Sequence, residues 1–89
     1  MKEVMSKAYV ALHKMGVPVY ENKTGMDKFH ISGTAEDDII WASYDFLTNN
    51  STEAKAYIFG VHPVLVSTLQ DYGLYAEWVN PEVLNVNYI

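Results

Sequence analysis

The stretch that decides the fold is LYAEWVNPEVLNVNYI, residues 74–89. In its second half, Leu84 and Val86 alternate with two asparagines, which gives a strand one apolar and one polar face. Pro81 and the polar residues on either side of it interrupt the stretch in the way that turns do. We therefore predict two strands around Pro81, of which the C-terminal one belongs to a sheet.

A second hairpin is predicted over residues 17–32. Its arms are VPVYE (17–21) and KFHIS (28–32), and its centre, NKTG (22–25), is rich in turn-forming residues. Alternation within both arms gives each strand one apolar face. Because edge strands expose unpaired backbone groups, this hairpin or the C-terminal strand could pair with a strand of another protein.

Two helices have clear sequence boundaries. Apolar residues at three- and four-residue spacing predict a helix over residues 2–15, and Gly16 ends it. A later helix is predicted from about Pro63, a residue that the first turn tolerates, to Tyr72. Gly73 follows it and repeats the glycine ending of the first helix.

The middle of the chain gives weaker signals. Thr34 with acids after it resembles a helix cap, so we predict a helix over residues 34–47. The apolar residues from Ile40 onward also alternate as in a strand, and a short apolar run does not separate the two structures. Residues 48–52 predict a loop, and residues 56–60 predict a short buried strand.

Together these elements follow the order α-ββ-α-β-α-ββ. They predict a small two-layer α+β domain, in which three helices pack on a mixed or antiparallel sheet of four to five strands. The strand at 56–60 could pair in parallel with the strand after the third helix, through a right-handed crossover. No repeat, linker or change in composition divides the chain, so we expect residues 1–89 to form a single domain.

Charge is distributed unevenly along the chain. After Lys28 there are eight carboxylates and one lysine, Lys55, whereas residues 1–28 hold five lysines and three acids. The chain has no arginine, and its net charge is -5. A field of this sign repels nucleic-acid phosphates and attracts basic surfaces. We therefore expect a protein partner with a basic surface and no direct binding to DNA or RNA.

The composition argues against several other classes of function. Without cysteine there is no disulfide, thiolate zinc site or thiol nucleophile, and this fits the cytoplasm. No apolar run has the length of a signal peptide or membrane span, so we expect no membrane association. His13, His30 and His62 lack the spacing of a shared metal site, and His62 lies where a helix cap would lie. We predict no catalytic residue, no metal and no cofactor.

An acidic and aromatic surface is the candidate binding site. Its predicted members are Glu36, Asp37, Asp38, Asp45, Trp41, Tyr44, Trp78 and Glu77. Carboxylates attract a basic partner, and aromatic side chains are common at protein interfaces. Two simpler interpretations stand beside this one: acids in a first helical turn satisfy the helix dipole, and the two tryptophans anchor the core.

The expected function is that of a small cytosolic protein-interaction module. Its acidic and aromatic surface would dock on a basic, nucleic-acid-handling protein or on a second copy of the chain. In size and in lacking arginine and cysteine, the chain is similar to short orphan proteins of phages and mobile elements, some of which inhibit host enzymes by acidic mimicry. That resemblance implies an inhibitor.

Two alternative functions remain open from the sequence. One is a small-ligand binding or enzymatic domain whose pocket is lined by Tyr44, His30, Trp78 and neighbouring carboxylates. The other is a structural accessory subunit that pairs through its edge strands.

Overall fold

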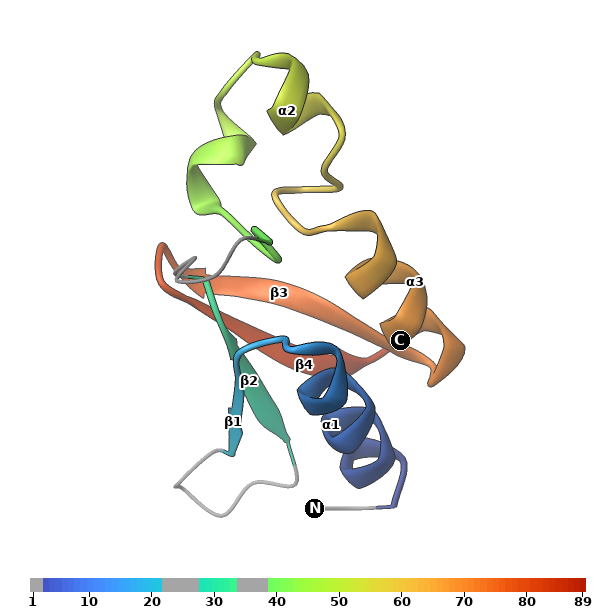
Figure 1. Ribbon diagram of the computed structural model, residues 1–89. Helices are drawn as coiled ribbons and strands as arrows, with labels where there is room; N and C mark the ends of the chain where they lie inside the picture. The colour runs from blue at the N-terminus through green and yellow to red at the C-terminus, as the bar shows by residue number, and fades with distance from the viewer. Residues whose placement is uncertain (1–2, 22–27, 34–38) are drawn as a thin grey trace.

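A computed structural model describes residues 3–21, 28–33 and 39–89 of the chain (Figure 1). Its elements, in chain order, are helix α1 (Glu3–Met15), strands β1 (Val19–Glu21) and β2 (Phe29–Ser32), the short 3-10 helix η1 (Tyr44–Leu47), helices α2 (Thr52–Lys55) and α3 (Pro63–Asp71), and strands β3 (Leu74–Asn80) and β4 (Val83–Tyr88). The predicted fold class is confirmed: the structure is a small α+β domain with three helices and a four-stranded antiparallel sheet.

The strand order in the sheet is β1-β2-β4-β3, so β1 and β3 are the two edges. Both predicted hairpins form, and β2 pairs with β4 to join them. Cross-strand partners share a face of the sheet. The face that is packed against the core carries a row formed by Val19, Ile31, Leu84 and Trp78. The opposite, polar face carries a row formed by Tyr20, His30, Asn85 and Glu77.

The core lies between the apolar face of the sheet and helices α1 and α3. Its fully buried side chains come from both layers: Met5, Leu12, Phe29, Ile31, Leu65, Leu69, Leu74, Leu84 and Val86. Burying this much apolar surface is the main term that stabilises a domain of this size. None of the helices in the described ranges is long and apolar enough to cross a membrane.

The helix boundaries agree with the sequence signals. Gly16 follows α1 with a φ of +90°, and Gly73 follows α3 with a φ of +72°, the left-handed conformation that favours glycine. The Nδ1 atom of His62 accepts a hydrogen bond from the backbone N–H of Val64 at 3.1 Å. His62 is thus the predicted cap of α3, and Pro63 is in its first turn.

The predicted helix over residues 34–47 is wrong in the part that the structure describes. Residues 39–43 are not helical, and only η1 follows them; residues 34–38 lie outside the described residues. Instead, Ala42 forms an isolated bridge with Val61, and the N–H of Ser43 donates to the carbonyl oxygen of Gly60 at 2.8 Å. These tertiary hydrogen bonds replace the helical ones and so override local propensity. The predicted loop also ends early, because Ser51 caps α2.

The predicted buried strand over residues 56–60 is wrong as well. Ile58 and Val61 exchange two backbone hydrogen bonds of 2.9 Å around a tight turn. The two central residues, Phe59 and Gly60, both have positive φ, +50° and +76°, as in a type I′ β-turn. No strand from this segment enters the sheet, so the predicted parallel pairing does not form, and the strands of the described residues all pair antiparallel.

Candidate functional site

The predicted acidic and aromatic surface is only partly visible. Glu36, Asp37 and Asp38 lie outside the described residues. Asp45 is exposed in η1, and Glu77 is exposed on β3. These two carboxylates belong to different elements, because only Glu77 is part of the sheet.

The aromatic members form two groups. The rings of Tyr44 and Trp78 meet edge to face, with centroids 5.4 Å apart. Trp41 belongs to the second group and packs against His62, at 5.1 Å between ring centroids. Both tryptophans are partly buried and pack against the core, which agrees with the simpler interpretation of them as core anchors. Glu77 lies on the polar face of β3, opposite to Trp78.

The pocket suggested for a ligand-binding or enzymatic domain does not form from its predicted residues. His30 lies on the polar face of the sheet, beside Tyr20, with 5.2 Å between the two ring centroids. Trp78 and its neighbour Tyr44 lie on the other side of the sheet. His30 and Trp78 therefore cannot line one cavity.

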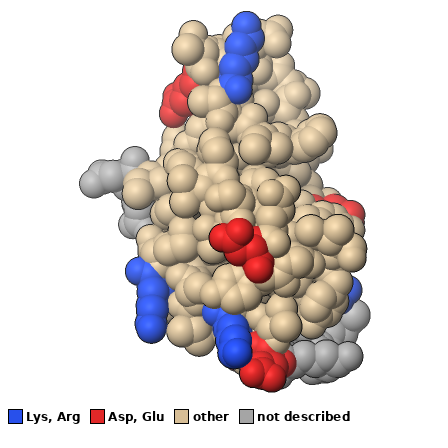
Figure 2. Space-filling view, turned by 90° about the vertical axis from the view of Figure 1, so that its right-hand side faces the viewer, with Lys and Arg blue, Asp and Glu red and all other residues tan. Residues whose placement is uncertain are grey.

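Charged side chains are dispersed on the face that Figure 2 shows. Acidic and basic groups both occur on this face, most of them set apart by uncharged surface, and a basic group touches an acidic one at the bottom of the view. One ion pair contributes to this mixing: Lys7 lies 3.1 Å from Glu3 on the exposed side of α1. Residues 56–89 contain three carboxylates and no lysine or arginine, so this part of the chain shares the acidic excess of the sequence after Lys28.

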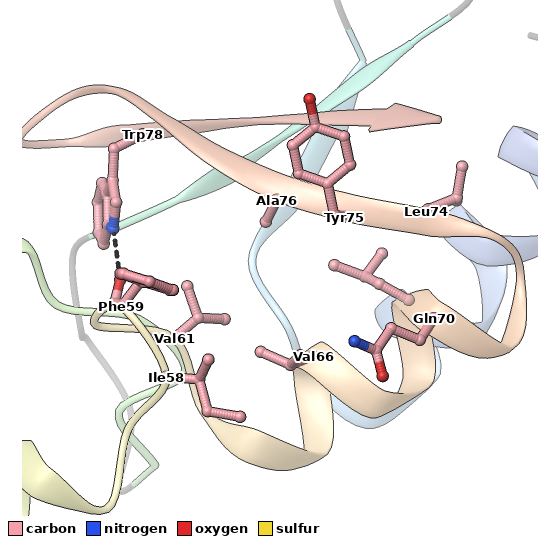
Figure 3. A pocket seen from close by; sticks show the side chains of 10 residues that line it. Ile58, Phe59, Val61, Val66, Gln70, Leu74, Tyr75, Ala76 and Trp78 are labelled. Atoms are coloured by element: carbon pink, nitrogen blue, oxygen red, sulfur yellow. Dashed lines mark hydrogen bonds between the residues drawn. The ribbon is translucent and has the colours of Figure 1, made fainter. Parts of the chain in front are cut away.

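A hollow of about 250 Å³ lies beside β3, between this strand, α3 and the turn at Phe59 and Gly60 (Figure 3). Its lining residues are Ile58, Phe59, Val61, Val66, Leu69, Gln70, Leu74, Tyr75, Ala76 and Trp78. They are almost all aliphatic or aromatic, and none is charged. The hollow is therefore suited to apolar groups rather than to acid–base chemistry.

The outer edge of β3 carries free backbone groups next to this hollow. The N–H of Ile89 donates to the carbonyl oxygen of Gly73, and Leu74 pairs with Tyr88. The first bond makes Gly73 and Ile89 a hydrogen-bonded pair. Hydrogen-bonded and non-hydrogen-bonded pairs alternate along an antiparallel ladder, so the next hydrogen-bonded residues of β3 are Tyr75 and Glu77, which exchange hydrogen bonds with β4. The N–H and C=O groups of the residues between them must then point away from β4, and these residues are Leu74, Ala76 and Trp78. Among the described residues, no strand pairs with this side of β3.

Phe59 is the most exposed aromatic side chain of the described part, at 81 %. Its φ of +50° is an uncommon value for a bulky residue and costs about 1–2 kcal/mol. Trp78 holds the turn in place, because its indole Nε1 donates to the carbonyl oxygen of Phe59 at 2.9 Å (Figure 3). An exposed aromatic side chain that is held in a strained conformation at the rim of an apolar hollow is a candidate contact residue.

The polar face of the sheet has two unpartnered polar atoms. Among the described residues, the buried His30 Nδ1 makes no hydrogen bond and the buried Asn85 Oδ1 accepts none, although the two residues are cross-strand partners. One row away, Lys28 Nζ donates to Asn87 Oδ1 at 2.9 Å. A buried polar atom without a partner costs free energy, so this row is a weak point of the sheet.

The ionisable groups of the described ranges were predicted to include no metal site, and Tyr57 is the group whose surroundings are most distinctive. They contain no cluster of three or more histidine, aspartate or glutamate side chains that could hold a metal ion. Burial, with a smaller contribution from the charge of Glu53, raises the pKa of Tyr57 above its usual value. Its hydroxyl donates to the carbonyl oxygen of Ile40 at 2.7 Å. Tyr57 therefore keeps its proton and acts as a structural hydrogen-bond donor.

The sequence analysis named Trp78 and Glu77 but missed the hollow that lies beside β3. Phe59 and Ile58 were missed because the apolar run around them indicated a buried strand. A short hairpin signal was present, since Gly60 stands in a turn position between apolar residues. Asparagine or aspartate usually precedes glycine in such turns, and phenylalanine in that place concealed it.

No protein-family model matches the chain. The comparisons with curated proteins and with solved structures gave no match either.

Proposed function

We propose that this chain is a protein-interaction module that takes up an extended segment of a partner protein along the open edge of β3. The observation that carries the proposal is the position of Leu74, Ala76 and Trp78, whose outward backbone groups lie beside an apolar hollow. Free edge groups give a strand hydrogen bonds, and a neighbouring pocket gives it side-chain contacts.

The surroundings of the edge support a protein ligand rather than a small molecule. Phe59 and Ile58 project from the turn on one side of the hollow, and they are 81 % and 45 % exposed. Val79, at 55 %, is a further exposed apolar side chain of β3, on the face that carries Tyr75 and Glu77. Exposed apolar groups that continue beyond a hollow are typical of a surface that a second protein covers.

The charge of this part of the chain supports a basic partner, as the sequence led us to expect. Residues 56–89 build β3, β4, α3 and the turn, and they contain no lysine or arginine. The proposal does not depend on the cluster of Glu36, Asp37 and Asp38. The compartment that we propose for the protein is the cytoplasm, because the chain has no cysteine. Inhibition of the partner is one consequence that such docking could have.

The experiment is a titration of the isotope-labelled chain with a peptide of seven residues, the length of β3. In this peptide, valine alternates with threonine. We expect the amide signals of Leu74, Ala76 and Trp78 to shift, because the peptide adds a strand to this edge. Ala76→Pro removes one outward N–H and no hydrogen bond to β4, so it should abolish these shifts. Ala76→Ser keeps the N–H at the same position and should preserve them.

Two outcomes would contradict the proposal. In one, peptides shift no signal of the β3 edge in the wild-type chain. In the other, the shifts persist unchanged in a folded Ala76→Pro variant. The wild-type titration remains decisive if that variant does not fold.

A further inference from the structure

We infer that the partner segment alternates apolar residues with lysine or arginine, with its apolar side chains in the hollow and a basic side chain beside Glu77. This inference rests on the proposed function, because it names the sequence of the segment that would pair with β3. It follows from which face of β3 each side chain occupies.

One face of the added strand must be apolar. Cross-strand partners place their side chains on the same face, so partner residues opposite Leu74, Ala76 and Trp78 would share the face of these three residues. That face is turned toward the hollow, where Val61, Val66 and other aliphatic side chains form the walls (Figure 3). A charged side chain directed there would lose its hydration without a partner, which is strongly unfavourable.

The opposite face of the added strand would lie beside the exposed side chains of β3. These are Tyr75, Glu77 and Val79, which alternate with the apolar-face residues, and Tyr75 points to the other side of β3 from Trp78 in Figure 3. The β4 neighbour of Glu77 is Asn85, which carries no charge. Glu77 makes no ion pair with another described residue, so a lysine or arginine opposite it would supply the missing cation, and opposite charges across strands attract.

A second copy of the chain is a poorer occupant of this edge. Two β3 strands pairing about Ala76 would place Tyr75 opposite Glu77, which gives the carboxylate no cation. Each copy also carries a net charge of -5, so the two chains repel one another. Self-association is therefore an outcome to be measured and not the proposed state.

The test compares three seven-residue peptides in which valine alternates with lysine, glutamate or threonine, added separately to the labelled chain. We expect the lysine peptide to bind roughly fivefold more tightly than the glutamate peptide, because a favourable cross-strand ion pair replaces a like-charge repulsion. Glu77→Lys should lower this preference by a similar factor. Glu21→Lys makes the same change in net charge on β1, at the far edge of the sheet, and should leave the preference within about twofold of wild type.

The outcomes separate this inference from the proposed function. If the three peptides bind the β3 edge equally, or if the two lysine variants change the preference equally, the inference is overturned and the proposed function stands. If none of the peptides shifts the β3 edge, both are overturned. A light-scattering mass of a dimer, with the edge signals already protected in the free chain, would assign the edge to a second copy and overturn the inference.

Discussion

The indole Nε1 of Trp78 donates a hydrogen bond of 2.9 Å to the carbonyl oxygen of Phe59. This contact joins the edge strand β3 to the tip of the turn that forms the other wall of the hollow. The ring of Trp78 is also packed closely on its other sides, because Gly33 lies against it and Tyr44 meets it edge to face. Trp78 therefore fixes the distance between β3 and the turn at Phe59, which are two walls of the hollow.

The first prediction concerns the strain at Phe59. Phe59→Asn should raise the free energy of unfolding by about 1 kcal/mol, because asparagine tolerates positive φ and is preferred before glycine in a type I′ turn. Phe59→Leu keeps the strain and should leave stability nearly unchanged. Urea denaturation of the three proteins measures the difference. If Phe59→Asn is no more stable than Phe59→Leu, the turn is not strained at this residue.

The same pair of variants links stability to binding. Phe59→Asn should weaken binding of the alternating peptides, since it removes an exposed apolar side chain from the rim of the hollow. A variant that gains stability and loses binding would identify Phe59 as a residue kept for contact. Unchanged peptide affinity would show that Phe59 takes no part in the site.

The second prediction compares two glycines with positive φ. A Cβ atom at Gly60 would come within 2.5 Å of the carbonyl oxygen of Ser43, whereas a Cβ atom at Gly73 would meet nothing within 4 Å. Gly60→Ala should therefore cost about 3 kcal/mol and Gly73→Ala about 1 kcal/mol, the latter for φ alone. Thermal or urea unfolding gives both values. Equal losses would mean that the backbone around Ser43 moves away freely.

The third prediction concerns alkaline pH. Because the pKa of Tyr57 is raised in the folded state, the unfolded chain loses this proton first as the pH increases. The contribution of Tyr57 to stability is complete below pH 10 and is lost as the pH rises above about 10. Tyr57→Phe should show a smaller decline in the free energy of unfolding over this range. Identical declines in both proteins would argue against burial of the hydroxyl.

The fourth prediction addresses the unpartnered atoms on the polar face. Asn85→Val should raise the free energy of unfolding by about 1 kcal/mol, because it removes a buried oxygen that has no hydrogen bond and adds a β-branched side chain. Asn87→Val is the matched control: it removes the acceptor of the Lys28 ammonium and should bring no gain. A similar gain in both variants would show that β propensity alone is responsible.

Local signals in the sequence were sufficient for much of the fold. Gly16 and Gly73 end their helices, and the alternating residues around Pro81 form the predicted hairpin, because each of these features depends on neighbours in the chain. The segments over residues 39–47 and 56–60 were mispredicted, since their conformation depends on contacts between distant residues. The bridge between Ala42 and Val61 is one such contact.

The candidate site could be predicted from the sequence less well than the fold. Glu77 and Trp78 were both named, yet their alternation places them on opposite faces of β3, so they cannot form one flat surface. Recognising the groove requires the strand order, which makes β3 an edge, and the strained turn at Phe59, which propensity disfavours. Neither follows from local patterns.

Amide hydrogen exchange along β3 tests the central claim most directly. In the free chain, the amides of Leu74, Ala76 and Trp78 should exchange quickly, and those of Tyr75 and Glu77 should be protected by β4. Addition of the alternating valine and lysine peptide should then protect the first three. The account is contradicted if these three amides are already protected in the monomeric free chain, or if the bound peptide leaves their exchange unchanged.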